Sequence, residues 1–409
     1  MSERRTPVRL QSALINGGLV VAGLWGLATP NPLATLWSLA LLAFILRSFW
    51  WVHFPGILLF CLLTPYIEIH TTVLEANNSG LTLDELYPGT GSPTFWMASI
   101  GLLIVTLGFQ WGTRGVQSQL TFTLDELRLQ AERISQTKLL AATFGANALS
   151  SVVNAIIPYG SSLRQLEFYI TGISTALTMA FALHFWLTRK RPWLALGLFL
   201  FLLITSFYSY FSSWRTPLVL FLVSVMVTFK EFGWRQFARL TPILLPAMGL
   251  VLVWQTVKAD YREFLSGGQR SQAVLVDRST ALNKFQELAT EAVASEAILD
   301  DRIASDTYRR AGYLEYFSAA VGKVPAEIPH ERGSLLRESL TFAFIPRILA
   351  PNKGVKNDRA KVEKYTDYYF GETSFSSFSL GHYCEAYIDW GPNLMMVHLL
   401  LYGLFGGPS

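Results

Sequence analysis

Hydrophobic positions in this chain come in long uninterrupted blocks that are separated by short polar connections. A block of about 20 residues is long enough for a helix to cross a hydrocarbon core of ~30 Å. The blocks therefore predict an all-α, multi-pass transmembrane protein with about ten spans. The predicted spans are 12–29, 33–47, 50–70, 94–112, 138–157, 164–187, 193–212, 215–230, 240–257 and 387–406.

One polar block is much longer than the others and covers residues 258–378. It divides the chain into spans one to nine with short loops (1–257), a long and mostly helical loop, and the loop exit with the last span (379–409). Apolar residues recur at helical spacing from Ser279 to Val321, which predicts two or three helices. The stretch Ser334 to Phe344 is apolar enough to lie on the membrane or dip into it.

The composition agrees with a membrane protein. Hydrophobic residues make up 51% of the chain and charged residues only 15%, whereas a soluble chain is about a quarter charged. The net charge of +4 is too small and too scattered to indicate nucleic-acid binding. Cys61 and Cys384 form no metal-ligand spacing, and the chain contains neither an Asp-x-Asp motif nor a His cluster. We therefore expect no cofactor and no metal.

Basic residues in the short connections predict the orientation in the membrane. Arg4, Arg5 and Arg9 place the N-terminus in the cytoplasm, and the other basic short connections then fall on the same side. The inner segment 120–136 has the pattern of an amphipathic helix on the membrane surface or of a solvated connector helix. Because successive connections alternate between the two sides, four connections are predicted on the outer side of the membrane, namely 71–93, 158–163, 213–214 and 258–378.

Three arginines, Arg215, Arg262 and Arg347, are predicted on the outer side, each at a membrane boundary. A guanidinium holds phosphate oxygens through paired hydrogen bonds, so several arginines together would neutralise a diphosphate. A single outer arginine is also commonly one that reaches for lipid headgroups. Between Arg347 and Lys364 basic residues outnumber acidic ones; for four of them a solvated face is the favoured interpretation, namely Lys356, Arg359, Lys361 and Lys364.

Ionisable residues also gather where the chain enters the last predicted span. His382 and Glu385 stand three residues apart, which is one face of a helix. Asp389 follows close to or inside the apolar run. Carboxylates at that depth are costly and are functional candidates. The alternative is that they pair with arginines only to dock the loop.

These motifs and their order resemble bacterial O-antigen and exopolysaccharide repeat-unit polymerases of the Wzy type. The resemblance covers roughly Ser212 to Gly391, and the N-terminal spans match only in being apolar. The motifs that carry it are the Ser-x-x-Arg turn at Ser212–Arg215, the Tyr261-Arg262 pair, the Gly333–Leu336 stretch, Ile345-Pro346-Arg347 followed by Pro351-Asn352-Lys353, and Ser-x-Gly-x-x-x-Glu-x-Tyr at Ser379–Tyr387.

The resemblance implies a GT-C-like membrane glycosyltransferase of the bacterial inner membrane that works on the periplasmic face. It would join oligosaccharide units carried on a polyprenyl diphosphate, without a metal, and possible partners include a chain-length regulator protein. Direct attack by the acceptor hydroxyl would invert the anomeric centre. The base candidates are Glu385, then His382, then Asp260; the diphosphate candidates are Arg215, Arg347, Arg262, Lys353 and Lys258.

Three rival functions remain open from the sequence. An O-antigen ligase would use the same chemistry with a lipid A core as acceptor. A lipid-linked oligosaccharide flippase would spread charges within the spans and show internal repeats, and neither pattern is evident. An exosortase-like transpeptidase would use Cys384, which lies beside His382 and needs a lowered pKa for that role.

Overall fold

The structure is a computed structural model of the 409-residue chain. It describes residue 18 and residues 20–49, 55–117, 124–156, 164–207, 215–227, 234–268, 275–295, 312–345, 358–369 and 379–406. Every regular element in these ranges is a helix, so the prediction of an all-α fold is confirmed for the described part of the chain.

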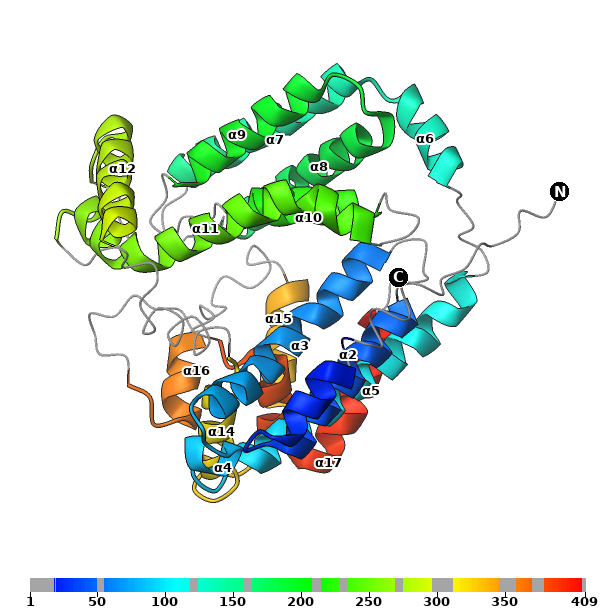
Figure 1. The fold of residues 1–409 in the computed structure, drawn as a ribbon, viewed down its shortest axis with the longest axis vertical. Helices are drawn as coiled ribbons and strands as arrows, with labels where there is room; N and C mark the ends of the chain where they lie inside the picture. The colour runs from blue at the N-terminus through cyan, green and yellow to red at the C-terminus, as the bar shows by residue number, and fades with distance from the viewer. Residues whose placement is uncertain are drawn as a thin grey trace.

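The helices follow one another in the order of Figure 1. They are α2 (Pro32–Phe49), α3 (Pro55–Asn78), α4 (Leu83–Leu86), α5 (Gly91–Gln117), α6 (Leu124–Arg133), α7 (Gln136–Ile156), α8 (Arg164–Thr188), α9 (Pro192–Phe207), α10 (Arg215–Val227), α11 (Trp234–Leu265), α12 (Arg278–Ala294), α14 (Leu314–Lys323), α15 (Ser334–Phe344), α16 (Asp358–Tyr365) and α17 (Gly381–Gly406).

The helices pack into two groups, which lie in the lower and upper halves of Figure 1. The lower group combines the two ends of the chain: α2, α3, α4 and α5 share one hydrophobic core with α14, α15, α16 and α17. The upper group holds α6 to α12, where α11 and α12 form one core cluster and α8 and α9 contribute to another. The outer loop predicted from the sequence is therefore divided, because α12 packs on α11 while α14 to α16 join the lower group.

Close contact between α5 and α17 depends on glycine. A Cβ at Gly108 would lie 2.9 Å from the Cα of Gly403, and one at Gly112 would lie 2.5 Å from the Leu404 carbonyl oxygen. A Cβ at Gly101 would meet Leu399 at 2.7 Å. Small residues at such positions let the two backbones approach, as in membrane helix pairs. The contacts advance together along both helices, so α5 and the end of α17 run parallel.

Helix α17 is broken at Gly391, which has φ 69° and ψ 177° and precedes Pro392. The Nε2 atoms of His382 and His398 lie 3.3 Å apart, although a straight helix would separate these residues by about 24 Å along its axis. The arm 381–390 therefore folds back beside the arm 391–406. Only the second arm of α17 corresponds to the predicted span 387–406, because a glycine at positive φ followed by proline ends the first arm inside that run.

Three described helices are long and apolar enough to cross a membrane, namely Pro32–Phe49, Gly91–Thr113 and Tyr169–Thr188. Two shorter apolar helices are Pro192–Ser206 and Thr216–Val225. All five coincide with predicted spans, but the described residues do not support the full count of ten. Several predicted boundaries also differ from the helices; α3, for example, continues to Asn78 and α11 to Leu265, beyond the expected ends at 70 and 257.

Candidate functional site

Helices α14 to α16 dock on one end of the lower group, next to the turn between α3 and α5 and the start of α17 (Figure 1). Hydrogen bonds join α14 and its flanking residues to α3, to the turn before α5 and to α17. They run from the Tyr313 N–H to the Glu68 carbonyl (2.8 Å), between the Thr90 and Ser318 hydroxyls (2.6 Å), and from the Tyr387 hydroxyl to the Val324 carbonyl (2.7 Å).

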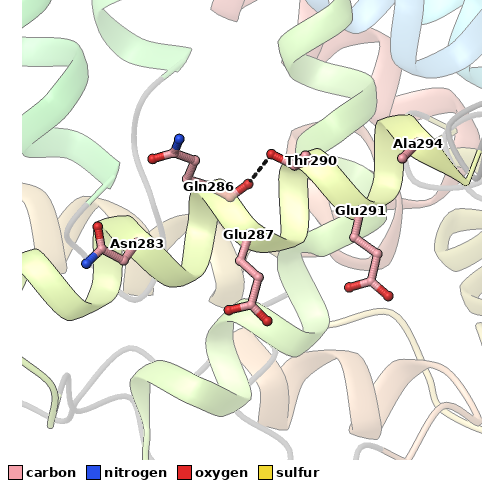
Figure 2. A pocket seen from close by; sticks show the side chains of 6 residues that line it. All are labelled: Asn283, Gln286, Glu287, Thr290, Glu291 and Ala294. Carbon is pink, nitrogen blue, oxygen red and sulfur yellow. Dashed lines mark hydrogen bonds between the residues drawn. The ribbon is translucent and has the colours of Figure 1, made fainter.

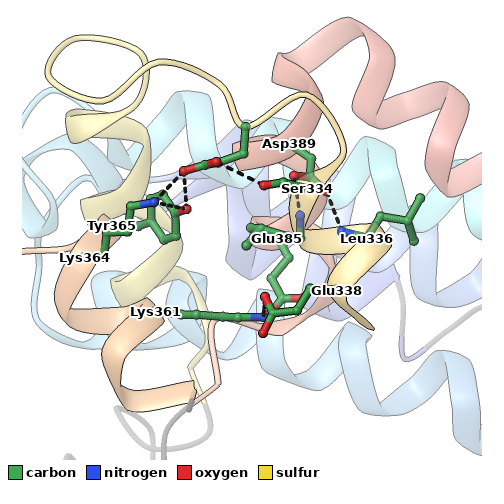
Figure 3. A network of polar contacts seen from close by, with 10 residues as sticks. Ser334, Leu336, Glu338, Lys361, Lys364, Tyr365, Glu385 and Asp389 are labelled. Atoms are coloured by element: carbon green, nitrogen blue, oxygen red, sulfur yellow. Dashed lines mark hydrogen bonds and ion pairs between the residues drawn. The ribbon is translucent and has the colours of Figure 1, made fainter. Parts of the chain in front are cut away.

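Asp389 ties the first arm of α17 to the beginning of α15. Its side chain is buried, and its two carboxylate oxygens accept from the backbone N–H groups of Leu335 at 3.0 Å and Leu336 at 2.8 Å (Figure 3). Helix α15 needs this external acceptor, because its N-cap residue is Gly333, which has no side chain to cap it. The structure thus assigns Asp389 a docking role, but its partners are backbone N–H groups and not the arginines that the sequence suggested.

Gly333 is required for the same junction. It adopts φ +87°, and a Cβ there would lie 2.5 Å from the ring of Trp390. The neighbouring backbone is bonded to the arm as well, since the Glu331 N–H donates to the Ile388 carbonyl at 3.0 Å and the Arg332 N–H to the Asp389 carbonyl at 2.9 Å. The start of α15 and the arm 381–390 therefore form one rigid unit.

Glu331 forms a second polar contact between the loop helices. Its carboxylate accepts from the Lys364 ammonium at 2.5 Å, the Tyr365 hydroxyl at 2.6 Å and the Ser334 hydroxyl at 3.0 Å (Figure 3). These bonds, led by the one from Lys364, lower the pKa of Glu331 to about 2. The interaction joins α16 to the segment that leads into α15.

We expect acid to weaken this contact. A carboxyl group with a lowered pKa in the folded state stabilises it above the unfolded-state pKa of about 4.3, and the stabilisation is lost as pH falls toward 2. Replacing Glu331 with Gln should therefore flatten the decrease in thermal stability between pH 5 and pH 3, by on the order of 1 kcal/mol after solvent screening. Glu327→Gln, at an exposed position of the same segment, is the matched control and should keep the wild-type acid dependence. Identical acid profiles for Glu331→Gln and wild type would contradict this role.

Lys361 lies between two carboxylates. Its ammonium is 3.2 Å from Glu338 Oε2 on α15 and 3.7 Å from Glu385 Oε1 on the first arm of α17 (Figure 3). The Lys361 and Glu385 side chains are 10% and 16% exposed, while Glu338 is half exposed. Among the described residues the buried Nζ atom has these ion-pair partners but no hydrogen bond of good geometry. We call Lys361, Glu385 and Glu338 the lysine–carboxylate site.

The sequence-based interpretation of Lys361 as part of a solvated face is wrong. The residue lies in an eight-residue helix whose buried residues are Lys361, Val362 and Tyr365. Its position four residues before Tyr365 was the available signal, because such residues share a helix face. Arg359, by contrast, pairs with Glu363 within the same helix at 2.8 Å, as expected for a surface pair.

His382 and Glu385 have different partners, although they are three residues apart. The His382 ring contacts His398, with 3.3 Å between the Nε2 atoms, and the ring of Tyr402, with 4.4 Å between centroids. Burial, and then the neighbouring His398, lower the pKa of His382 to about 4. His382 is therefore neutral near pH 7, and Glu385 alone of the pair belongs to the lysine–carboxylate site.

The remaining predicted site residues lie elsewhere or outside the description. Asp260, Lys258 and Arg262 lie on α11, where Asp260 is exposed and the Lys258 ammonium donates to Gln255. Helix α11 belongs to a core cluster with α12, separate from the one around Glu385. Arg215 is the first residue of α10, and its side chain is outside the described part; Arg347 and Lys353 fall wholly outside the described residues.

Cys384 is an unfavourable nucleophile. Its side chain is completely buried, and burial raises the pKa of the thiol well above its ordinary value. A catalytic cysteine needs the opposite shift, because the thiolate is the reactive form. The described residues also contain no group of three or more His, Cys, Asp or Glu side chains placed to hold a metal ion.

A hollow of about 480 Å³ lies along the exposed face of α12, and Figure 2 shows the side chains that line it. All of its lining residues belong to this one helix, and Glu287 is already paired with Lys284 at 2.7 Å. The hollow is an open helix surface and offers no convergent groups. It is lined by Asn283, Gln286, Glu287, Thr290, Glu291 and Ala294.

Comparison with known proteins places the chain among proteins without an assigned activity. No curated protein and no solved structure matches it. One protein family matches residues 112–406, which is more than half of the chain and includes the lysine–carboxylate site. The chain belongs to this family, which is described as a domain of unknown function, DUF8712.

Proposed function

We propose that the protein is a GT-C-like membrane glycosyltransferase that polymerises polyprenyl-diphosphate-linked oligosaccharide units on the periplasmic face of a bacterial inner membrane. The donor and the acceptor are both lipid-linked, the product is a surface polysaccharide, and a chain-length regulator is a plausible protein partner. The count of about ten spans belongs to this proposal, as do the cytoplasmic N-terminus and the periplasmic position of the long loop.

Helix directions in the lower group support this topology. With a cytoplasmic N-terminus, the fourth and tenth spans both run inward, and α5 and the second arm of α17 are indeed parallel. The second and third spans should be antiparallel. Side-chain contacts between α2 and α3 agree, since Asn31 bonds to Asn77 and Ser38 to His70. The docked loop helices all gather at the end expected to face outward.

The observation that carries the proposal is the lysine–carboxylate site at this outer end. The buried Lys361 ammonium has ion-pair partners but no hydrogen bond among the described residues. A substrate hydroxyl would supply the missing hydrogen-bond acceptor. Glu385 is mostly buried and lies four residues from the anchored Asp389, so its position is fixed by the fold. A carboxylate held in place where an acceptor hydroxyl can reach it is a candidate general base.

The proposed reaction is a single inverting displacement. The acceptor hydroxyl loses its proton to Glu385 and attacks the anomeric carbon of the donor, and the bond to the lipid diphosphate breaks. The diphosphate leaves as an anion, so the charge that develops there needs preorganised cations. We assign this role to Arg215 and Arg347, then to Arg262, Lys353 and Lys258, and His382 and Asp260 remain secondary base candidates. No step requires a metal or a cofactor.

Deleting the gene in the producing bacterium tests the function. We expect long polysaccharide to disappear and single repeat units to remain on the surface, with polymer restored by the wild-type gene. The measurement is the ladder of extracted glycan together with mass spectrometry of the lipid-linked oligosaccharides. Accumulation of lipid-linked polymer would instead indicate a ligase, and retention of single units on the cytoplasmic side would indicate a flippase. A deletion strain with normal polymer refutes the proposal.

A further inference from the structure

A cavity of about 220 Å³ lies in the upper group of helices, whereas the lysine–carboxylate site lies in the lower group (Figure 1). It opens where α6 and α7 meet the turn between α8 and α9. Cavities of about 300–1,000 Å³ hold drug-sized ligands, so this one suits a smaller group, such as a headgroup. Its walls come from the two segments around 132–137 and 184–191, both of which the sequence predicts to lie at the cytoplasmic face.

Two side chains in this wall are buried and incompletely bonded. Gln136 is 7% exposed; its amide nitrogen donates to the Lys190 carbonyl at 3.0 Å, and its Oε1 atom has no partner in the described structure. His184 is 5% exposed, and its Nε2–H donates to the Ile134 carbonyl at 3.0 Å. The Nδ1 atom of His184 then carries a lone pair, and within the described ranges it too lacks a partner. Both open atoms are acceptors, so a ligand that completes them must carry hydrogen-bond donors.

The same cavity is lined by cationic groups. Lys190 and Arg191 belong to its wall, and the one acidic residue in the described wall, Glu132, lies 3.7 Å from the Lys190 ammonium in an exposed pair. The 21-residue helix α7 begins at Gln136, so its first backbone N–H groups lie at the cavity as well. Helix N-termini favour phosphate, and two neighbouring cations strengthen that preference.

The surroundings match the interface of a membrane. Leu129, Ile134 and Trp193 expose more than half of their surface around this end of the fold. The Arg189 guanidinium stacks over the Trp186 ring at 4.8 Å. Exposed tryptophan beside basic residues is typical of the level of lipid headgroups, and basic cavities between helices on the cytoplasmic side bind anionic headgroups.

We propose that this cavity binds the phosphoglycerol headgroup of an anionic lipid. The phosphate lies against Lys190, Arg191 and the N-terminus of α7. The glycerol hydroxyls donate to Gln136 Oε1 and His184 Nδ1. The site is independent of glycosyl transfer, because it faces the other side of the membrane from the lysine–carboxylate site. It links the protein to the lipid composition of the inner leaflet.

Binding to the purified full chain in detergent tests the proposal with four probes. They are phosphatidylglycerol, phosphatidylmethanol with the same charge but no headgroup hydroxyl, phosphatidylcholine, and soluble glycerol phosphate. We expect phosphatidylglycerol to bind about tenfold more tightly than phosphatidylmethanol, since the two open acceptors need hydroxyl donors, and phosphatidylcholine to bind most weakly. Equal affinity for phosphatidylglycerol and phosphatidylmethanol would show that the headgroup hydroxyls make no contact and would overturn the proposal. Soluble glycerol phosphate as tight as the lipid would overturn the lipid source.

A charge variant with a matched control completes the test. The double substitution Lys190→Gln and Arg191→Gln should weaken phosphatidylglycerol binding by at least about tenfold. Arg128→Gln removes a cation from α6 outside the cavity, where Arg128 pairs with Asp125 at 3.6 Å, and should leave binding unchanged. Equal losses in both variants would show a non-specific charge effect and overturn the site. If the double variant does not fold, the four-probe series on the wild-type protein decides the question.

Discussion

Replacing Glu385 with glutamine should abolish polymer formation while the protein still reaches the membrane in normal amount. Glutamine keeps the shape of the side chain and its packing, but it takes no proton from the acceptor hydroxyl. General-base catalysis contributes about 10²–10⁴-fold to a rate, so residual polymer should be undetectable on a gel. The measurement is the glycan ladder of the deletion strain complemented with the variant, normalised to the protein in the membrane fraction.

Glu338 provides the matched control. It also pairs with Lys361, at 3.2 Å, but it is half exposed, whereas Glu385 is mostly buried. Glu338→Gln should therefore leave near-normal polymer. If Glu385→Gln makes polymer of normal length, Glu385 is not the base; if both variants lose it equally, the effect is loss of charge around Lys361 rather than proton transfer. Arg347→Ala in the same assay tests the diphosphate role separately.

Removing the Asp389 carboxylate should cause a large loss of stability, because it detaches α15 from the first arm of α17. Asp389→Ala leaves the Leu335 and Leu336 N–H groups without their acceptor at a buried helix start. Loss of a helix cap costs about 1–2 kcal/mol, and burial of unpaired donors adds to it, for a total of about 2–4 kcal/mol. Thermal unfolding of the purified full chain in detergent measures the effect.

Asp367 is a suitable control for Asp389. It lies in the same group of loop helices and bonds to Lys323 at 2.8 Å, but its side chain is 89% exposed. Asp367→Asn should leave the melting temperature close to that of wild type, because water replaces the lost partner. A melting temperature for Asp389→Ala equal to that of the Asp367 variant would show that α15 does not depend on this cap.

The pattern of apolar residues located helices well, because the spacing that favours a helix can be read within a short stretch of sequence. The expected spans 138–157 and 164–187 agree within two residues with Gln136–Ile156 and Arg164–Thr188. The predicted amphipathic segment at 120–136 contains α6, and the apolar stretch from Ser334 to Phe344 forms α15. The break at Gly391 was also available, because Gly-Pro commonly ends a helix, but the long apolar run around it masked the signal.

The site was only partly predictable, because its members meet through tertiary contacts. Glu385 was singled out by its position beside an apolar run, but its partner Lys361 lies 24 residues earlier, in a short helix of mixed charge. Asp389 was a functional candidate from its depth in the apolar run, and its partners, more than 50 residues away, show that it caps a helix. No local pattern encodes either pairing. The sequence predicted that His382 and Glu385 share one helix face, but it gave no sign of the contact between His382 and His398. That contact forms only because α17 folds back.

The cap that Asp389 places on α15 also has a mechanical consequence. Helix α15 exposes Leu340, Phe342 and Phe344, so lipid chains or a lipid-linked substrate can press on it directly. Its first turn is held by Asp389, and Glu385 lies one helical turn before Asp389 on the same short arm. No flexible connection separates the two. The helix and the arm are therefore coupled, and we expect any displacement of α15 to be passed to the arm that carries Glu385.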